Sequence, residues 1–128
     1  MEIVLYLPWP PTVNDYYGEK MVKRRRIRYI KAKGKRFRQE VEQAVAEQSA
    51  NLNLGEPLLV EVELYPPDNR RRDLDNYQKS LLDAITQAGV WEDDSLIDQL
   101  FIYRGNKVEQ GAVVVRIGQA GPKLFLAT

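Results

Sequence analysis

Residues 58–89 read LLVEVELYPPDNRRRDLDNYQKSLLDAITQAG, and two hydrophobic periodicities meet in this stretch. Within residues 58–65, apolar side chains alternate with Glu61 and Glu63, which is typical of a strand with one buried face. From near Asp73 the apolar residues recur every three or four positions, which predicts an amphipathic helix. Gly89 is suited to end this helix, because glycine readily adopts the left-handed conformation that follows many helices. The stretch therefore predicts a strand followed by a helix.

The same periodicities predict the remaining elements, which are a strand at 2–7, a helix at about 34–50, and strands at 96–103 and 112–117. We expect the last two strands to form a hairpin through the Gly105–Asn106 region. Residues 12–30 lack clear periodicity and are expected to form a long, partly mobile loop, and residues 119–128 a flexible tail. The order is then β-α-β-α-β-β. It implies an α+β fold with α/β layering, in which two helices cover a small mixed sheet of about four strands.

Composition excludes several classes of site. The chain has 128 residues, the length of one domain. It contains no cysteine, which excludes disulfides, a thiolate nucleophile and thiolate zinc sites. It also contains no histidine, which excludes the Ser-His-Asp triad and imidazole metal sites. Any metal must be held by oxygen atoms, which favours magnesium, manganese or calcium over zinc or copper.

The N-terminal segment is too short and too acidic for a signal peptide, and Pro8 interrupts it. No apolar run approaches the roughly 20 residues of a membrane span. With neither an export signal nor cysteine, we expect a cytoplasmic protein.

Charge is strongly segregated along the chain, although the net charge is only +1. Residues 20–38 contain 11 of the 19 basic residues and no acidic one, and Arg70, Arg71 and Arg72 add three more. Residues 73–98 then contain seven acidic residues and one basic residue, Lys79. A basic region beside an acidic cluster can bind a polyanion and a divalent cation together. The alternative is that the basic run forms a solvated charged surface, as most such runs do.

Asp73 and Asp75 are the first candidates for metal ligands. In extended backbone, residues two apart point to the same side, so these carboxylates can converge where the chain enters the helix. Magnesium is commonly bound by such oxygen ligands. The alternative is that one of them caps the helix or stabilises its first turn. Lys79 lies four residues after Asp75, so it either forms a surface ion pair with it or neutralises charge developing on a phosphate.

Residues 91–94, WEDD, supply the next acidic side chains. On their own they suggest only an acidic turn in which Trp91 packs into the core. Together with Asp73, Asp75 and Lys79 they fit metal-assisted phosphodiester hydrolysis. In that chemistry carboxylates hold a metal that activates water and polarises the phosphate, and cations hold the nucleic-acid backbone.

Four segments together resemble the signature of the RusA family of Holliday-junction resolvases: RRRDLDNxxK at 70–79, LDA at 82–84, AGxWxDD at 88–94, and LPWPPTxN at 7–14. The resemblance spans about residues 3–117. It implies a homodimeric, magnesium-dependent endonuclease, with Mn²⁺ as a substitute cation. Such enzymes nick opposing strands of a four-way DNA junction, in recombination and repair and often from prophage loci.

Carried over to this chain, the resemblance implies that Asp73, Asp75 and Asp94 are the metal-binding catalytic aspartates and that Lys79 is the catalytic lysine. Asp93 is the less favoured neighbour of Asp94. The residues expected to bind DNA are Asn14, Lys23, Arg24, Arg25, Arg26, Arg28, Lys31, Lys33, Lys35, Arg36, Arg70, Arg71 and Arg72. Two alternatives remain open: a nuclease on other branched DNA such as flaps or forks, and a non-catalytic nucleic-acid-binding or regulatory protein.

Overall fold

The structure, a computed structural model, describes residues 2–121. In chain order its elements are β1 (Ile3–Leu7), α1 (Val13–Tyr16), β2 (Tyr17–Val22), β3 (Arg25–Ile30), α2 (Ala32–Glu47), β4 (Leu58–Tyr65), α3 (Asp75–Gln87), the 3₁₀ helix η1 (Asp94–Leu96), β5 (Ile97–Arg104) and β6 (Ala112–Gln119).

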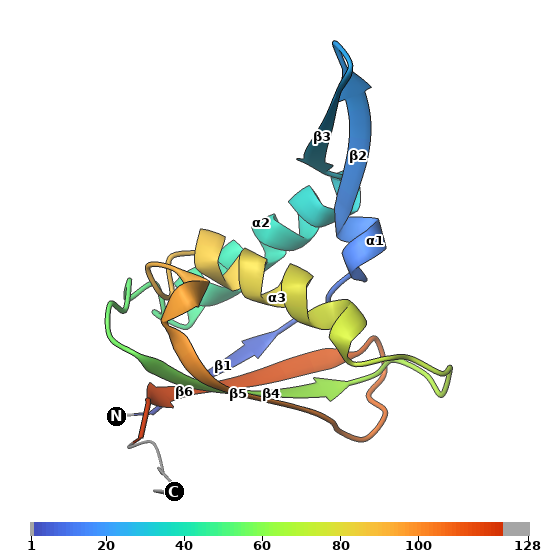
Figure 1. The fold of residues 1–128 in the computed structure, drawn as a ribbon. Coiled ribbons are helices and arrows are strands. Elements are labelled where there is room, and N and C mark those ends of the chain that lie inside the picture. Colours follow the sequence, from blue (N-terminus) through green and yellow to red (C-terminus); the bar gives the residue numbers. More distant parts are fainter. Residues whose placement is uncertain (1, 122–128) are drawn as a thin grey trace, which may run out of the picture.

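Four of the strands form one mixed sheet in the order β1-β6-β4-β5. β6 pairs antiparallel with β1 and with β4, whereas β5 pairs parallel with β4. Helices α2 and α3 lie together on one face of this sheet (Figure 1). The predicted α+β fold, with two helices on a mixed sheet of four strands, is confirmed. β2 and β3 form a separate two-stranded sheet that the sequence did not predict.

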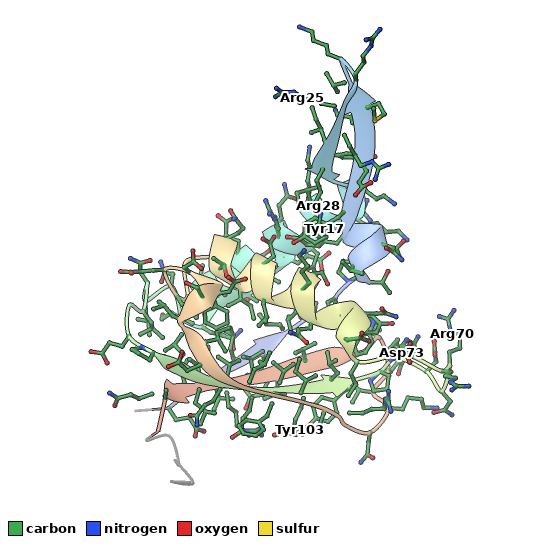
Figure 2. The ribbon with its side chains drawn as sticks, viewed as in Figure 1. Tyr17, Arg25, Arg28, Arg70, Asp73 and Tyr103 are labelled. Atoms are coloured by element: carbon green, nitrogen blue, oxygen red, sulfur yellow. The ribbon has the colours of Figure 1, made fainter. Side chains whose placement is uncertain are left out.

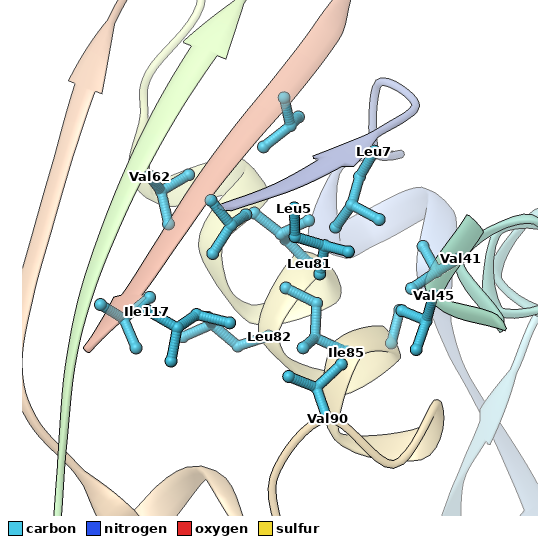
Figure 3. Packing of buried hydrophobic residues seen from close by; sticks show 14 of the residues in the cluster. Leu5, Leu7, Val41, Val45, Val62, Leu81, Leu82, Ile85, Val90 and Ile117 are labelled. Carbon is cyan, nitrogen blue, oxygen red and sulfur yellow. The ribbon is translucent and has the colours of Figure 1, made fainter. Parts of the chain in front are cut away.

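The core lies between the sheet and the two helices. β4 buries every second side chain, as its alternating sequence requires, and Val62 is 1% exposed. Leu81 and Ile85, four residues apart on α3, are buried in the same cluster as Val62 and Leu5 (Figure 3). Truncating a side chain such as Leu81 to alanine costs about 2–5 kcal/mol. This burial fixes the rotation of α3 about its axis and leaves the face that carries Lys79 exposed.

The end of α3 is as predicted. Gly89 follows the C-cap residue Ala88 and has a φ of +83°, in the left-handed region that favours glycine.

The prediction of a loop at residues 12–30 is wrong. The segment forms α1 and a hairpin in which β2 and β3 pair from Tyr17–Ile30 to Val22–Arg25. The hairpin extends away from the sheet and the helices (Figure 1). Its turn residues, Lys23 and Arg24, have φ values of 50° and 64°. Two-residue hairpin turns of this kind are normally marked by Asn-Gly or Asp-Gly, so Lys-Arg gave no turn signal.

The predicted hairpin between the last two strands is also wrong. β5 pairs with β4 in parallel, because α3 lies between them and returns the chain to the same end of the sheet. The connection over residues 105–111 then carries the chain past β4, and β6 pairs between β1 and β4. β5 is therefore an edge strand and does not contact β6 through backbone pairing.

The C-terminal prediction is tested only in part. Residue 119 ends β6, and the backbone N–H of Ala120 donates to the carbonyl of Pro57 at 3.0 Å, so residues 119–120 are held by the sheet. The rest of the predicted tail, residues 122–128, lies outside the described residues. No helix within residues 2–121 is both long enough and apolar enough to cross a membrane.

Candidate active site and nucleic-acid interface

The candidate catalytic residues come from α3 and from η1, which packs against it. Asp73 lies just before α3, Asp75 is its first residue, Lys79 follows one turn later, and Asp94 begins η1. All four side chains are exposed. Within residues 2–121, the side chains of Asp73 and Asp75 make no hydrogen bond or ion pair with another side chain.

The structural alternatives for these carboxylates are not observed. The N-cap of α3 is Leu74, without a side-chain capping hydrogen bond, so neither Asp73 nor Asp75 caps the helix. No ion pair joins Asp75 to Lys79 among the described residues. Asp75 still gains from its place in the first turn, where the helix dipole favours negative charge. Both carboxylates are therefore available to a ligand.

Asp93 and Asp94 differ although they are neighbours. Asp93 caps η1, where its carboxylate accepts a hydrogen bond from the backbone N–H of Ser95 at 2.8 Å, and this bond lowers its pKa. Burial raises the pKa of Asp94, and the negative charges of Asp93 and Asp83 raise it further. A carboxylate beside other carboxylates favours the approach of a cation. Asp94, which is not engaged as a helix cap, is therefore the better candidate of the pair to bind a cation.

The donor chemistry fits magnesium, because the available ligands are carboxylate oxygens. Among the described residues, however, no three Asp or Glu side chains are close enough together to hold a metal ion between them. This spacing does not exclude magnesium, which usually binds one or two protein carboxylates and takes further ligands from water and substrate phosphates.

Lys79 contacts the hairpin in a way that the sequence did not reveal. Its Nζ lies 5.4 Å from the centroid of the Tyr17 ring, and the Cζ of Arg28 lies 3.9 Å from the same centroid. Figure 2 shows Tyr17 and Arg28 at the base of the hairpin, where it joins the helices. The basic hairpin and the face of α3 that carries the candidate catalytic residues therefore meet at one aromatic side chain.

Asp83 is engaged within the protein and is not a solvated surface charge. Its side chain is 25% exposed, and its Oδ2 accepts hydrogen bonds from the hydroxyl of Tyr16 and from Nη2 of Arg38, the latter at 2.6 Å. Burial and the hydrogen bond to Asp83 raise the pKa of Tyr16. This network ties α1, α2 and α3 together beneath Tyr17. Its signal in the sequence was weak, because its members are 22 to 67 residues apart.

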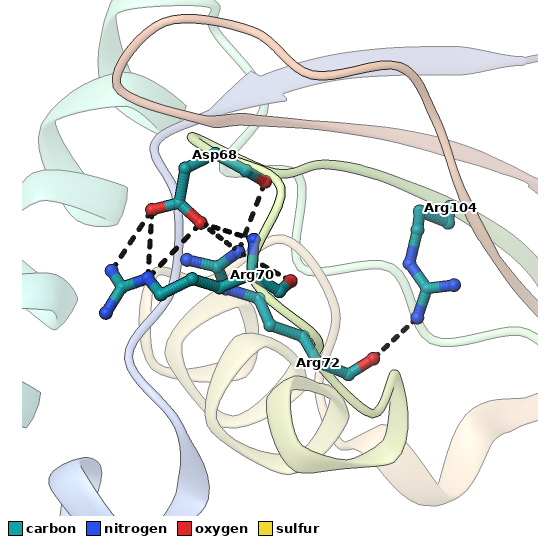
Figure 4. Close-up of polar contacts among 4 residues, drawn as sticks. All are labelled: Asp68, Arg70, Arg72 and Arg104. Atoms are coloured by element: carbon teal, nitrogen blue, oxygen red, sulfur yellow. Dashed lines mark hydrogen bonds and ion pairs between the residues drawn. The ribbon is translucent and has the colours of Figure 1, made fainter.

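The arginines at 70–72 have unequal roles (Figure 4). Asp68 accepts hydrogen bonds from Arg72 at 2.7 Å and from Arg70 at 3.1 Å, and these cations hold its pKa well below its usual range. The side chain of Arg72 is only 12% exposed, and its carbonyl accepts a hydrogen bond from Arg104 at 2.6 Å. Arg71 has no hydrogen bond or ion pair with the described residues. Of the three, Arg71 is the most available to an external anion.

Two cavities flank this loop, and both are lined by Trp9 and by all three arginines. The first, of about 530 Å³, also includes Lys33 and Arg36 from α2. The second, of about 590 Å³, extends to Arg104 and Lys107. Both are therefore cationic hollows of a kind that accepts phosphate groups.

The other residues expected to bind DNA lie on the hairpin, on α1 and at the start of α2. Some are engaged within the chain. Nζ of Lys31 donates to the backbone carbonyl of Asn14 at 2.8 Å. Nζ of Lys33 lies 4.0 Å from Oδ2 of Asp15, and Nε of Arg26 lies 3.6 Å from Oε2 of Glu19. The side chains of others have no hydrogen bond or ion pair among the described residues, namely Lys23, Arg24, Arg25, Lys35 and Arg36.

Comparison with known proteins identifies the family. The sequence model described as Endodeoxyribonuclease RusA matches residues 8–118. The chain belongs to the RusA family. The family match covers β2, β3 and η1, so the hairpin and the candidate site that it adjoins both lie inside the matched region.

Individual RusA proteins agree with this assignment. The crossover junction endodeoxyribonucleases RusA of Shigella sonnei strain Ss046 and Escherichia coli strain K12 are 34% and 33% identical to this chain, each over 90% of this chain and 92% of the relative. The protein of that name from Enterobacteria phage HK97 is 36% identical over 91% of this chain and 93% of its own length. The resemblance drawn from the four sequence segments is confirmed, and the phage relative agrees with the expected link to prophages.

Proposed function

We propose that this chain is a crossover junction endodeoxyribonuclease that resolves Holliday junctions in DNA recombination and repair. The observation that carries the proposal is the pair of unpartnered carboxylates, Asp73 and Asp75, one turn before Lys79 in a RusA-family chain. Magnesium dependence, paired nicks and the homodimer belong to the same proposal.

In this proposal Asp73, Asp75 and Asp94 would together bind Mg²⁺, for which Mn²⁺ can substitute: one or two of the carboxylates would bind the ion directly and the rest through water molecules on it. The bound cation would supply Lewis-acid polarisation of the scissile phosphate. Lys79 places a positive charge beside the same phosphate and stabilises the negative charge that develops during hydrolysis. Exposed cations of the hairpin and Arg71 bind the DNA backbone.

A homodimer follows from the symmetry of the substrate. Two symmetric nicks across a junction with a two-fold axis require two active sites related by that axis. Sedimentation analysis of the purified protein should give a dimer. A chain that remains a monomer both alone and on a junction would contradict paired nicking by a dimer.

The substrate is tested by incubating the protein with a synthetic four-way junction, a flap, a replication fork and a linear duplex in Mg²⁺. We expect nicks at symmetric positions in the junction and little cleavage of the linear duplex. Preferential cleavage of flaps or forks would favour the alternative nuclease. Junction binding without cleavage in either Mg²⁺ or Mn²⁺ would favour the non-catalytic alternative.

The carboxylates are tested by the changes Asp73→Asn, Asp75→Asn and Asp94→Asn, which keep shape and remove charge. Each should nearly abolish cleavage and leave junction binding intact or slightly tighter. Asp93→Asn is the matched control for Asp94→Asn, because asparagine also caps helices and Asp93 is already engaged as a cap. Normal cleavage by any of the three variants would remove that residue from the site.

Lys79→Ala separates catalysis from surface charge. An electrostatic catalyst contributes about a hundredfold or more in rate, whereas an exposed lysine contributes almost nothing. Lys35→Ala is the control: Lys35 is an exposed lysine of α2 that is expected to bind the DNA backbone, so this change should weaken junction binding and leave the cleavage rate at saturating protein unchanged. We expect Lys79→Ala to lose cleavage without a change in melting temperature.

A further inference from the structure

Tyr17 occupies the point where the hairpin joins the helices. It is the C-cap of α1 and the first residue of β2, and it pairs with Ile30, the last residue of β3. Its side chain is partly buried, so one part of the ring packs against the protein and the rest remains accessible.

The ring of Tyr17 contacts cations from two different elements. Arg28 comes from β3, and its Cζ lies 3.9 Å from the ring centroid, while Lys79 comes from α3, and its Nζ lies 5.4 Å from it. The face of an aromatic ring attracts cations, so this one side chain offsets part of the repulsion between two positive groups. Both groups are thereby held near one place on the surface.

The position of the Tyr17 ring is itself fixed from below. Tyr16 is fully buried and meets Tyr17 edge-on, with ring centroids 4.5 Å apart. The hydroxyl of Tyr16 is bound by Arg38 at 2.6 Å and by Asp83. Because these partners belong to α2 and α3, the helices determine where the Tyr17 ring lies, and the ring in turn determines where Lys79 and Arg28 lie.

We propose that Tyr17 is a positioning residue for phosphodiester hydrolysis, whose ring holds Lys79 and Arg28 so that both reach the scissile phosphate. The inference rests on the proposed function. It adds that the ring of Tyr17 supports both cations, and that Arg28 contacts the scissile phosphate instead of binding the DNA backbone in general. A positioned pair of cations stabilises a developing negative charge better than two mobile ones, because the pair need not be reorganised during the reaction.

The hairpin contains a matched control for this role. Lys20 lies 5.3 Å from the centroid of the Tyr29 ring, a cation–ring pair with nearly the same distance as that of Lys79 and Tyr17. Gly18, opposite Tyr29 in the β2–β3 register, lies on the other face of the ribbon from Tyr17. The Tyr29 pair therefore lies on the opposite face of the ribbon from Tyr17 and its cations, so its loss should affect the hairpin alone.

The test compares Tyr17→Leu, Tyr17→Phe and Tyr29→Leu by single-turnover cleavage of a four-way junction in Mg²⁺ and by junction binding without divalent cation. We expect Tyr17→Leu to slow cleavage about tenfold or more with less than a threefold change in binding. Tyr17→Phe keeps the ring and should stay within about threefold of the wild type, as should Tyr29→Leu. Equal losses in Tyr17→Leu and Tyr29→Leu would overturn the proposal.

Two further measurements distinguish positioning from folding. Residues that act as a unit lose activity non-additively, so Tyr17→Leu should slow a variant that already lacks both Lys79 and Arg28 hardly at all. Full additivity would overturn the proposal. If Tyr17→Leu does not fold, phenylalanines of increasing fluorination at position 17 keep the shape and weaken cation binding by the ring. The rate should then fall with each added fluorine, and a constant rate would contradict the inference.

The two proposals fail in different ways. If the wild-type chain does not nick the junction, the proposed function is wrong. If the wild type and Lys79→Ala behave as expected while Tyr17→Leu cleaves normally, only the role of Tyr17 is wrong.

Discussion

The hairpin of residues 17–30 and the loop of residues 68–72 are both rich in arginine, yet they present their charge differently. On the hairpin, the side chains of Lys23, Arg24 and Arg25 have no hydrogen bond or ion pair with the described residues. In the loop, Arg70 and Arg72 both bind the carboxylate of Asp68, and Arg72 is largely buried. The number of cations in a segment therefore overstates how many can reach a phosphate, and each segment must be judged by its internal ion pairs.

The largest effect should come from the hairpin. Changing Arg24, Arg25 and Arg26 together to Gln should weaken junction binding and flatten the log–log salt dependence by roughly two to three units, because each neutralised phosphate contributes about 0.9. Cleavage at saturating protein should largely survive. The matched control is the triple change to Lys, which keeps the charge and should keep the slope. An unchanged slope in the Gln variant would assign DNA binding to Arg71 and the start of α2.

The loop should divide its effects between two neighbouring residues. Arg71→Gln should flatten the salt slope by about one unit and leave the melting temperature unchanged, because Arg71 has no partner within residues 2–121. Arg72→Gln should lower the melting temperature and leave the salt slope unchanged, because it removes a cation that is already paired with Asp68. Binding titrations at several salt concentrations and thermal melts check both. Equal slopes for the two variants would remove the distinction between a binding arginine and a structural one.

The ion pairs of the loop should also be visible in the pH dependence of stability. Arg72 and Arg70 hold the pKa of Asp68 below its unfolded value of about 3.9. A carboxylate with a depressed pKa stabilises the fold above the unfolded pKa, and this contribution is lost as pH falls through the folded value. The wild type should therefore have a higher melting temperature than Asp68→Asn at pH 7, and this difference in melting temperature should shrink below about pH 4. A difference that is constant with pH would contradict this role.

The smallest effect concerns the hairpin turn. Lys23 and Arg24 both have positive φ, which costs roughly 1–2 kcal/mol for a residue with a side chain. Replacing them with Asn-Gly suits this turn and should raise the hydrogen-exchange protection of the β2 and β3 amides. Junction binding should become less dependent on salt concentration, because two cations are removed. Lower protection in the Asn-Gly variant would contradict the turn geometry.

The hairpin was missed in the sequence for two physical reasons. Apart from Tyr17, Gly18 and Ile30, every residue of β2 and β3 is exposed, so burial imposed no alternation on the side chains. The turn also lacks glycine and asparagine, the residues that normally mark it. In β4, by contrast, burial of one face imposed the alternation, and the predicted bounds of Leu58–Tyr65 were correct.

The predicted site residues remain predictions, although their surroundings are now described. Spacing within residues 70–79 was sufficient to place Asp73, Asp75 and Lys79 at the start of one helix, because neighbours on a helix follow from local geometry. The role of Asp83 could not be predicted, because its partners, Tyr16 and Arg38, come from α1 and α2. The contact between Lys79 and Tyr17 was missed for the same reason.

The sequence by itself determined the helices and strands that bury a face, the oxygen-only chemistry open to a metal, and the family, because each is written in local spacing and composition. Only the tertiary structure decided which charges remain available. It engaged Arg72 with Asp68, left Arg71 without a partner, and brought Arg28 and Lys79 to one ring. Tyr17 is distant in the chain from Lys79, and the packing of α2 and α3 on the sheet brings the two side chains together. Asp68 and Arg72 are only four residues apart, but their ion pair depends on the conformation of the loop, which no periodic pattern records.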